Sequence, residues 1–217
     1  MDIFEALKPG DPQQVGPYRI VARLGAGGMG RVYLGQSRGG RAFAVKVVHP
    51  ELAENRDFRR RFVREVAAAR RVNGVFTAGL VDADPEGSPA WLATVYVPGI
   101  SLDQAVAQHG PWPQAPSLAL AAALAEALEA IHAAGVVHRD LKPSNVLLAV
   151  DGPRVIDFGI SLSHGGMTSI TGTGEAIGTP GFMSPEQLMR GSVGSASDVF
   201  SLGAVLALVA CGTGPFG

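Results

Sequence analysis

The hydrophobic pattern of the chain changes once, near residues 95–100. Upstream of this point, residues 18–37 and 41–50 contain short runs in which apolar and polar residues alternate between glycine clusters. This pattern is typical of antiparallel strands joined by tight turns. Downstream, residues 117–135 and 197–210 have the apolar spacing of helices. The sequence therefore predicts an α+β protein, with a leader at 1–15, a small, mostly β lobe at 16–97 and a mostly helical lobe at 98–217.

One helical segment interrupts the β pattern of the first lobe. Residues 55–72 place Phe58, Phe62, Val66 and Ala69 at a spacing of three and four, opposite an arginine-rich face. This spacing predicts an amphipathic helix with one apolar stripe. Strand-like runs at 77–87 and 90–97 complete the lobe.

Composition and charge exclude several classes of protein. The 217 residues are 47% hydrophobic and carry a net charge of −1, which is typical of a globular protein and argues against general nucleic-acid binding. The apolar run at 201–211 is shorter than the roughly 20 residues that span a membrane. No signal peptide opens the chain, so we expect a cytoplasmic protein with no membrane segment. Cys211, inside the apolar run, is expected to be buried.

The glycine cluster at Gly25, Gly27 and Gly30 has the spacing G-x-G-x-x-G, followed by Val32. With 29 glycines in the chain, such a spacing also arises by chance. A dinucleotide-binding fingerprint requires a strand before the glycines and a helix opening at them. Here a second strand follows, so the sequence predicts a hairpin whose tip folds over phosphates.

Lys46 lies in the middle of a predicted strand, between two valines. Such a lysine commonly points outward into solvent. The alternative is an ammonium that binds a polyanion and is held by a carboxylate. Glu65, the acid in the body of the arginine-rich helix, is the candidate partner, although a solvated acid among arginines is an equally simple interpretation.

The loop HRDLKPSN at 138–145 concentrates polar side chains directly after a predicted helix. Twelve residues beyond Asn145, Asp157 follows an apolar strand and precedes Phe-Gly. Asn145 and Asp157 supply hard oxygen ligands and Asp140 supplies a base, as Mg²⁺-assisted phosphoryl transfer requires. A lone Asp in a loop is more often a turn or helix cap, but the ordered set of motifs disfavours that interpretation.

Taken in order, these motifs resemble those of bacterial, actinobacterial-like eukaryotic-type serine/threonine protein kinases. The set comprises G-x-G-x-x-G-x-V, A-V-K, H-R-D-L-K-P-x-N, D-F-G, G-T-P-G-F-M-S-P-E and S-D-V-F-S-L-G, and it covers nearly the whole chain from Val15 onward. The resemblance implies a two-lobed protein kinase-like fold. It also implies ATP and Mg²⁺ as cofactors and transfer of the γ-phosphoryl group to Ser or Thr of proteins.

The resemblance also assigns roles to individual residues. Asp140 would be the catalytic base beside Lys142, Lys46 would hold the α- and β-phosphates and pair with Glu65, and Asn145 and Asp157 would hold the metal. The nucleotide would contact the glycine loop, the residues around the adenine and the hinge: Leu24, Gly25, Ala26, Gly27, Gly28, Met29, Gly30, Val32, Ala44, Lys46, Val95, Val97 and Leu147.

The segment 157–186 resembles an activation loop. Lys142, two residues after the catalytic acid, goes with Ser/Thr substrates in this family, with Thr179 near the substrate hydroxyl. Arg139 would receive a phosphate added to the loop. Thr171 and Thr173, then Thr168 and Ser169, are the candidate sites of autophosphorylation, and a hydroxyl-rich loop that is never modified is the alternative. The resemblance also allows a homodimer in which one chain phosphorylates its partner.

The chain stops at Gly217, whereas the family continues through further helices. The resemblance therefore predicts a larger lobe without its last helices, in which Glu186 lacks the arginine that pairs with it. A truncated ATP-binding or interaction module with weak or no activity is the alternative function. A small-molecule phosphotransferase is disfavoured by the segment G-T-P-G-F-M-S-P-E, which serves protein substrates in this family.

Overall fold

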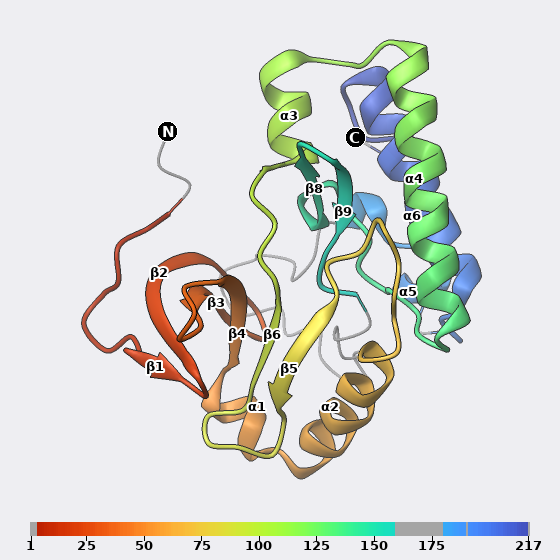
Figure 1. Ribbon diagram of the computed structural model, residues 1–217. Coiled ribbons are helices and arrows are strands. Elements are labelled where there is room, and N and C mark those ends of the chain that lie inside the picture. The colour runs from red at the N-terminus through yellow and green to blue at the C-terminus, as the bar shows by residue number, and fades with distance from the viewer. Residues whose placement is uncertain (1–3, 159–179, 190, 217) are drawn as a thin grey trace. The chain divides into compact units, whose positions relative to one another are not determined.

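The computed structural model describes residues 4–158, 180–189 and 191–216 (Figure 1). These residues form two compact units, which we describe separately. Unit 1 contains the residues up to Arg70 together with Ala78–Val97. Unit 2 contains Arg71–Thr77 together with the described residues from Pro98 onward.

Unit 1 is built on a six-stranded antiparallel sheet with the strand order β1-β2-β3-β4-β6-β5. Buried and more exposed residues alternate along β3 and β4, as the sequence pattern predicts. The buried face forms a core in which the rings of Tyr18, Phe43 and Trp91 pack together, with Tyr18 edge-on to Trp91 at 5.7 Å between centroids. The strands are β1 (Gln14–Val15), β2 (Tyr18–Gly27), β3 (Gly30–Gln36), β4 (Ala42–Val48), β5 (Leu80–Asp84) and β6 (Trp91–Val95).

Two helices, α1 (Pro50–Glu54) and α2 (Arg56–Ala69), follow β4. The side chain of Asn55 caps α2 by accepting a hydrogen bond from the backbone N–H of Phe58 at 3.0 Å. The four residues predicted to form the apolar stripe are the buried residues of this helix. The hydrophobic period therefore identified both the helix and its buried face.

Unit 2 contains four α-helices, a three-stranded sheet and two short 3₁₀ segments within the described residues (Figure 1). The helices α4 and α6, which correspond to the two predicted helices, pack side by side. The helices are α3 (Leu102–His109), α4 (Gln114–Ala133), α5 (Pro185–Leu188) and α6 (Ser195–Cys211). The remaining elements are β7 (Ile100–Ser101), β8 (Val146–Ala149), β9 (Gly152–Val155), η1 (Pro143–Asn145) and η2 (Pro180–Phe182).

Helix α6 has a mixed buried face. Ala204, Val205 and Val209 are buried, and so are the polar side chains Ser197, Asp198 and Ser201 in its first two turns. Cys211, at the end of the helix, is exposed. The expectation of a buried cysteine was wrong because the apolar run fills a complete helix, of which only one face is covered. Among the described residues, no helix is both long enough and apolar enough to cross a membrane.

Candidate active site

The glycine cluster forms the hairpin between β2 and β3, as the sequence predicts. Gly25 and Gly27 are exposed, and a Cβ added at either would meet no atom within 4 Å. Gly30 is different, because a Cβ there would overlap the carbonyl oxygen of Val47 on β4. The turn itself is held by the backbone N–H of His49, which donates to the carbonyl oxygen of Met29 at 3.0 Å. The hairpin is thus open along its β2 side and tightly packed against β4 along its β3 side.

The register of β3 and β4 gathers three predicted nucleotide-binding residues on one face. Val32 pairs with Lys46, and Ala44 lies two residues before Lys46 on the same strand. Because directly paired residues and residues two apart share a face, all three lie together. Each is half-buried, whereas the neighbouring Tyr33 and Val45 on the opposite face belong to the core. This face presents an ammonium between small apolar side chains.

Other predicted residues of unit 1 lie close to these elements in the sequence. Leu24 directly precedes the hairpin tip and is half-buried. Glu65 is half-buried on α2, and its pairing with Lys46 stays a prediction. At the predicted hinge, the backbone N–H of Val95 donates to the carbonyl oxygen of Gly79 at 3.1 Å, and Val97 is buried.

In unit 2, the loop after α4 brings Asp140, Lys142 and Asn145 together. The Lys142 ammonium lies 2.9 Å from a carboxylate oxygen of Asp140. The Asn145 amide nitrogen donates to the carbonyl oxygen of Asp140 at 2.7 Å and to its carboxylate at 3.1 Å. The Asn145 side chain is therefore oriented with its nitrogen towards Asp140, which leaves its amide oxygen as the atom for a cation.

Asp157 is connected to this loop through the backbone. The carbonyl oxygen of Asn145 accepts a hydrogen bond from the N–H of Ile156 at 3.0 Å. Asp157 follows with a φ of 58°, in the left-handed region that non-glycine residues rarely adopt. Leu147 lies between these residues in the sequence, on β8, where it pairs with Arg154 of β9. The β8–β9 hairpin thus connects the two predicted metal ligands.

A buried carboxylate on α6 supports the start of the loop. Asp198, which is 1% exposed, accepts hydrogen bonds from the backbone N–H groups of His138 and Arg139, each at 2.8 Å. Asp198 also contacts α4, through Nε2 of His132 at 2.7 Å. Arg139 has a φ of 68°, and its carbonyl oxygen accepts from the Gln187 amide at 2.6 Å. The backbone beside Asp140 is therefore fixed from both sides.

The imidazole of His138 is fully buried, and this burial lowers its pKa. Its Nδ1 accepts a hydrogen bond from the backbone N–H of Asp140 at 3.2 Å. A nitrogen that accepts carries no proton, so the ring is neutral with its proton on Nε2. His138 acts here as part of the support of the loop.

Glu186 is hydrogen-bonded to a hydroxyl group on α6. Its carboxylate accepts a hydrogen bond from the hydroxyl of Ser197 on α6, which is the main cause of its lowered pKa. The Ser201 hydroxyl, one turn further along α6, donates to the carbonyl oxygen of Phe182 at 2.8 Å. Helix α6 therefore binds η2 and α5 through hydroxyl groups.

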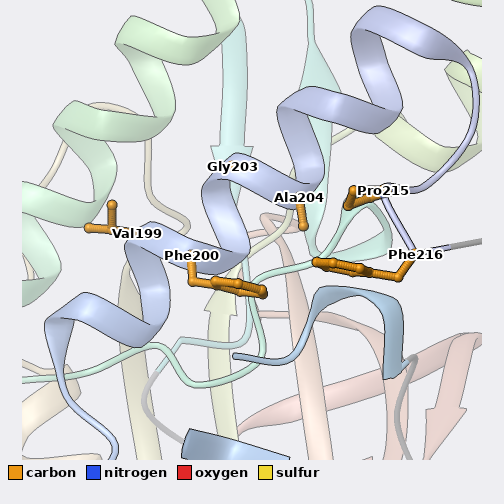
Figure 2. A pocket seen from close by; sticks show the side chains of 6 residues that line it. All are labelled: Val199, Phe200, Gly203, Ala204, Pro215 and Phe216. Carbon is orange, nitrogen blue, oxygen red and sulfur yellow. The ribbon is translucent and has the colours of Figure 1, made fainter. Parts of the chain in front are cut away.

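Two hollows lie on unit 2. The smaller, of about 290 Å³, is lined by apolar residues of α6 and the segment after it, and Phe200 stacks on Phe216 there (Figure 2). No lining side chain is charged, so this hollow is no candidate for catalysis. The larger, of about 920 Å³, includes Lys142 and Ser144 of the loop with Phe182 and Met183.

Sequence reasoning missed the support of the loop. Asp198 lies inside the quoted motif S-D-V-F-S-L-G, but its partners are 59 and 60 residues away in the sequence. An acid in an otherwise apolar helix was the available signal. The candidate phosphorylation sites Thr168, Ser169, Thr171 and Thr173, and also Thr179, lie outside the described residues.

Comparisons with known proteins identify the family of the chain. The protein kinase domain family matches residues 18–217. The chain is 56% identical over 216 residues to the probable serine/threonine-protein kinase PkwA of Thermomonospora curvata, covering 99% of this chain and 29% of that protein. It is 55% identical over 215 residues to the serine/threonine-protein kinase AfsK of Streptomyces coelicolor, covering 99% and 27%.

The fold also matches that of a solved structure. The crystal structure of the Mycobacterium tuberculosis PknI kinase domain aligns with a TM-score of 0.77 at 30% identity, covering 97% of this chain and 78% of that one. The two-lobed kinase fold predicted from the motifs is therefore confirmed. The chain spans less than a third of the curated relatives PkwA and AfsK. By the match to the family and by its fold, the chain belongs to the protein kinase domain family.

Proposed function

We propose that the chain transfers the γ-phosphoryl group of ATP to Ser or Thr hydroxyl groups of proteins. The observation that carries this proposal is the arrangement of Asp140 with Lys142 and Asn145. A carboxylate beside an ammonium and an amide, on a loop with a fixed backbone, fits a base that accepts the proton of an attacking hydroxyl. The relatives PkwA and AfsK are themselves described as serine/threonine kinases.

The residues of unit 1 fit the binding of a nucleotide triphosphate. Exposed glycines at the hairpin tip allow close approach of backbone N–H groups to phosphates. Lys46 supplies a positive charge on the same face as Val32 and Ala44, which are suited to contact an adenine ring. In this proposal Lys46 binds the α- and β-phosphates and Glu65 orients it.

Asn145 and Asp157 fit a magnesium ion. Mg²⁺ is bound through one or two protein oxygens, and substrate phosphates and water complete its octahedral shell. The Asn145 amide, with its nitrogen committed to Asp140, presents an oxygen. The metal would neutralise negative charge on the phosphates during transfer. The role of Asp140 is to accept the proton as the hydroxyl oxygen bonds to phosphorus and ADP leaves.

Protein substrates fit the larger hollow beside the loop, because its lining combines Lys142 with the apolar side chains of Phe182 and Met183. The substrates include the chain itself, at Thr171 or Thr173, with Thr168 and Ser169 as further sites. Phosphorylation in trans would pair two copies as a transient homodimer. A cytoplasmic location, where ATP and Mg²⁺ are available, belongs to the same proposal.

Phosphate transfer from labelled ATP to the chain and to a generic protein substrate tests the proposal. Asp140→Asn is expected to lower the transfer rate by roughly 10²–10⁴-fold, the usual contribution of a general base, with ATP affinity retained. The matched control is Asp151→Asn, the same change at an exposed carboxylate in the β8–β9 turn. Transfer by Asp140→Asn at the rate of the control would refute the role of Asp140. ATP binding without transfer by the unaltered chain would favour the inactive binding module.

A further inference from the structure

The segment before the first strand packs on the sheet of unit 1. Residues 4–13, which we call the N-terminal strap, are joined to β2 by two backbone hydrogen bonds between Glu5 and Arg23, of 3.1 and 2.8 Å. Further along the strap, the side chain of Asp11 is fully buried. A carboxylate is costly to bury unless hydrogen bonds and an opposite charge pair it fully.

Asp11 is fully paired. One carboxylate oxygen accepts from the backbone N–H of Lys8 at 2.7 Å and from Nε of Arg23 at 2.6 Å. The other accepts from Nη2 of Arg23 at 2.6 Å and from the hydroxyl of Tyr33 at 2.9 Å. The guanidinium is thus bound bidentately, the strongest geometry for such a pair. The hydrogen bonds from Arg23 hold the pKa of Asp11 well below its usual range, so the carboxylate is charged under physiological conditions.

The partners of Asp11 lie at the base of the glycine hairpin. Arg23 on β2 and Tyr33 on β3 are directly paired across the sheet. Arg23 precedes Gly25 by two residues, and Tyr33 follows Gly30 by three. The pairing of β2 with β3 shifts register between Arg23 and Gly25, which makes Leu24 an extra residue at this point. One side chain therefore binds both strands where they enter the hairpin.

An irregularity of this kind determines where a hairpin tip points. A bulge bends its strand and increases the local twist, so the tip is directed by the strand geometry at the bulge. On the β3 side the tip is attached to β4, since Gly30 pairs with Val48 and the N–H of His49 donates to Met29. On the β2 side it has no such attachment, because Gly25 and Gly27 are exposed and a Cβ at either would meet no atom within 4 Å. A displacement at the base is transmitted to the tip as a larger displacement.

We propose that Asp11 is a positioning residue for the phosphates of ATP, acting through Arg23 and Tyr33 on the direction of the glycine hairpin. The inference rests on the proposed function, since it requires that the hairpin bind phosphates. A carboxylate that only stabilised the sheet would affect all ligands of unit 1 alike. A carboxylate that positions the hairpin changes the affinity for ligands that carry phosphates and leaves the affinity for the nucleoside unchanged.

The test compares the affinities of the full chain for ATP and for adenosine by calorimetry, at a temperature where circular dichroism shows each variant to be folded. In Asp11→Asn the affinity for ATP is expected to fall roughly tenfold to a hundredfold, as when one hydrogen bond to a charged phosphate is lost, while the affinity for adenosine is retained. The Michaelis constant of this variant for ATP should rise as its affinity for ATP falls. Tyr33→Phe, which removes one of the four hydrogen bonds, should shift ATP affinity in the same direction by less.

The matched control is Asp82→Asn. Asp82 is half-exposed on β5 of the same sheet and lies 3.7 Å from Arg70. The ratio of ATP affinity to adenosine affinity in Asp82→Asn should equal the ratio in the unaltered chain. Equal loss of ATP and adenosine affinity in Asp11→Asn, or no loss of either, overturns the inference and leaves the proposed function intact. Failure of the unaltered chain to bind ATP overturns both. If Asp11→Asn does not fold, an unchanged affinity ratio in Tyr33→Phe decides against the inference.

Discussion

The carboxylate of Asp198 is expected to be a major source of stability in unit 2. The change to test is Asp198→Ala, which removes the acceptor for the N–H groups of His138 and Arg139. The His138 side chain is fully buried and the Arg139 residue half-buried, so solvent does not readily replace the lost acceptor. The loop at 138–145 would lose its support at the residue before Asp140.

The magnitude follows from the two backbone hydrogen bonds. A hydrogen bond to a charged group contributes about 1.5–3 kcal/mol, so their loss costs about 3–6 kcal/mol. The contact with His132 is left out of this sum because that ring is partly exposed. A domain has a total stability of about 5–15 kcal/mol, so Asp198→Ala removes a large part of it.

Urea unfolding followed by circular dichroism measures the loss, and amide hydrogen exchange over residues 136–146 shows where it acts. Exchange in this stretch should become much faster than in β3 and β4. The matched control is Asp103→Ala, at an exposed acid in the first turn of α3, which should cost less than about 1 kcal/mol. A free energy of unfolding for Asp198→Ala within 1 kcal/mol of the control would refute the reasoning.

Two further predictions concern a buried ring and a buried glycine. Burial holds the folded pKa of His138 below the unfolded value of about 6.5, so the unfolded chain takes up the proton first and stability falls as pH drops below about 6.5, by at most about 1.4 kcal/mol per pH unit. His138→Phe should flatten this dependence in urea unfolding between pH 5 and pH 7.5, and an unchanged slope would exclude His138 as its source. Gly30→Ala should lower thermal stability by about 1–3 kcal/mol, because its Cβ would overlap the Val47 carbonyl. Gly25→Ala, where the added Cβ meets open space, should leave the melting temperature near that of the unaltered chain, and equal losses in the two variants would contradict the packing argument.

The sequence was most informative where the structure depends on neighbours a few residues apart. Alternation with a period of two located β3 and β4, and the spacing of Phe58, Phe62 and Val66 located α2 with its buried face. The strand that follows Gly30 was enough to distinguish a hairpin from the strand–turn–helix of a dinucleotide-binding site. Each of these signals lies within a few consecutive residues, so it can be recognised in a single sequence.

The supports of the site could not be predicted in this way. Asp11 binds side chains 12 and 22 residues away, and Asp198 binds groups 59 to 66 residues away. Nothing in the immediate neighbours of either acid indicates which groups these are. The sequence pattern separates a leader from the first lobe, whereas residues 4–13 of this leader pack on the sheet of unit 1. The same limit applies to Cys211, whose exposure depends on which face of α6 is covered.

The contact between α6 and the loop at 138–145 also has a consequence for synthesis of the chain. Asp198 follows His138 by 60 residues, so the loop lacks its acceptor until α6 has been made. At about 5–20 residues per second, this interval lasts about 3–12 s on the ribosome. The strands of unit 1 are complete by Val95, before the loop is translated. The nascent protein can therefore form its glycine hairpin several seconds before Asp140 is held in place.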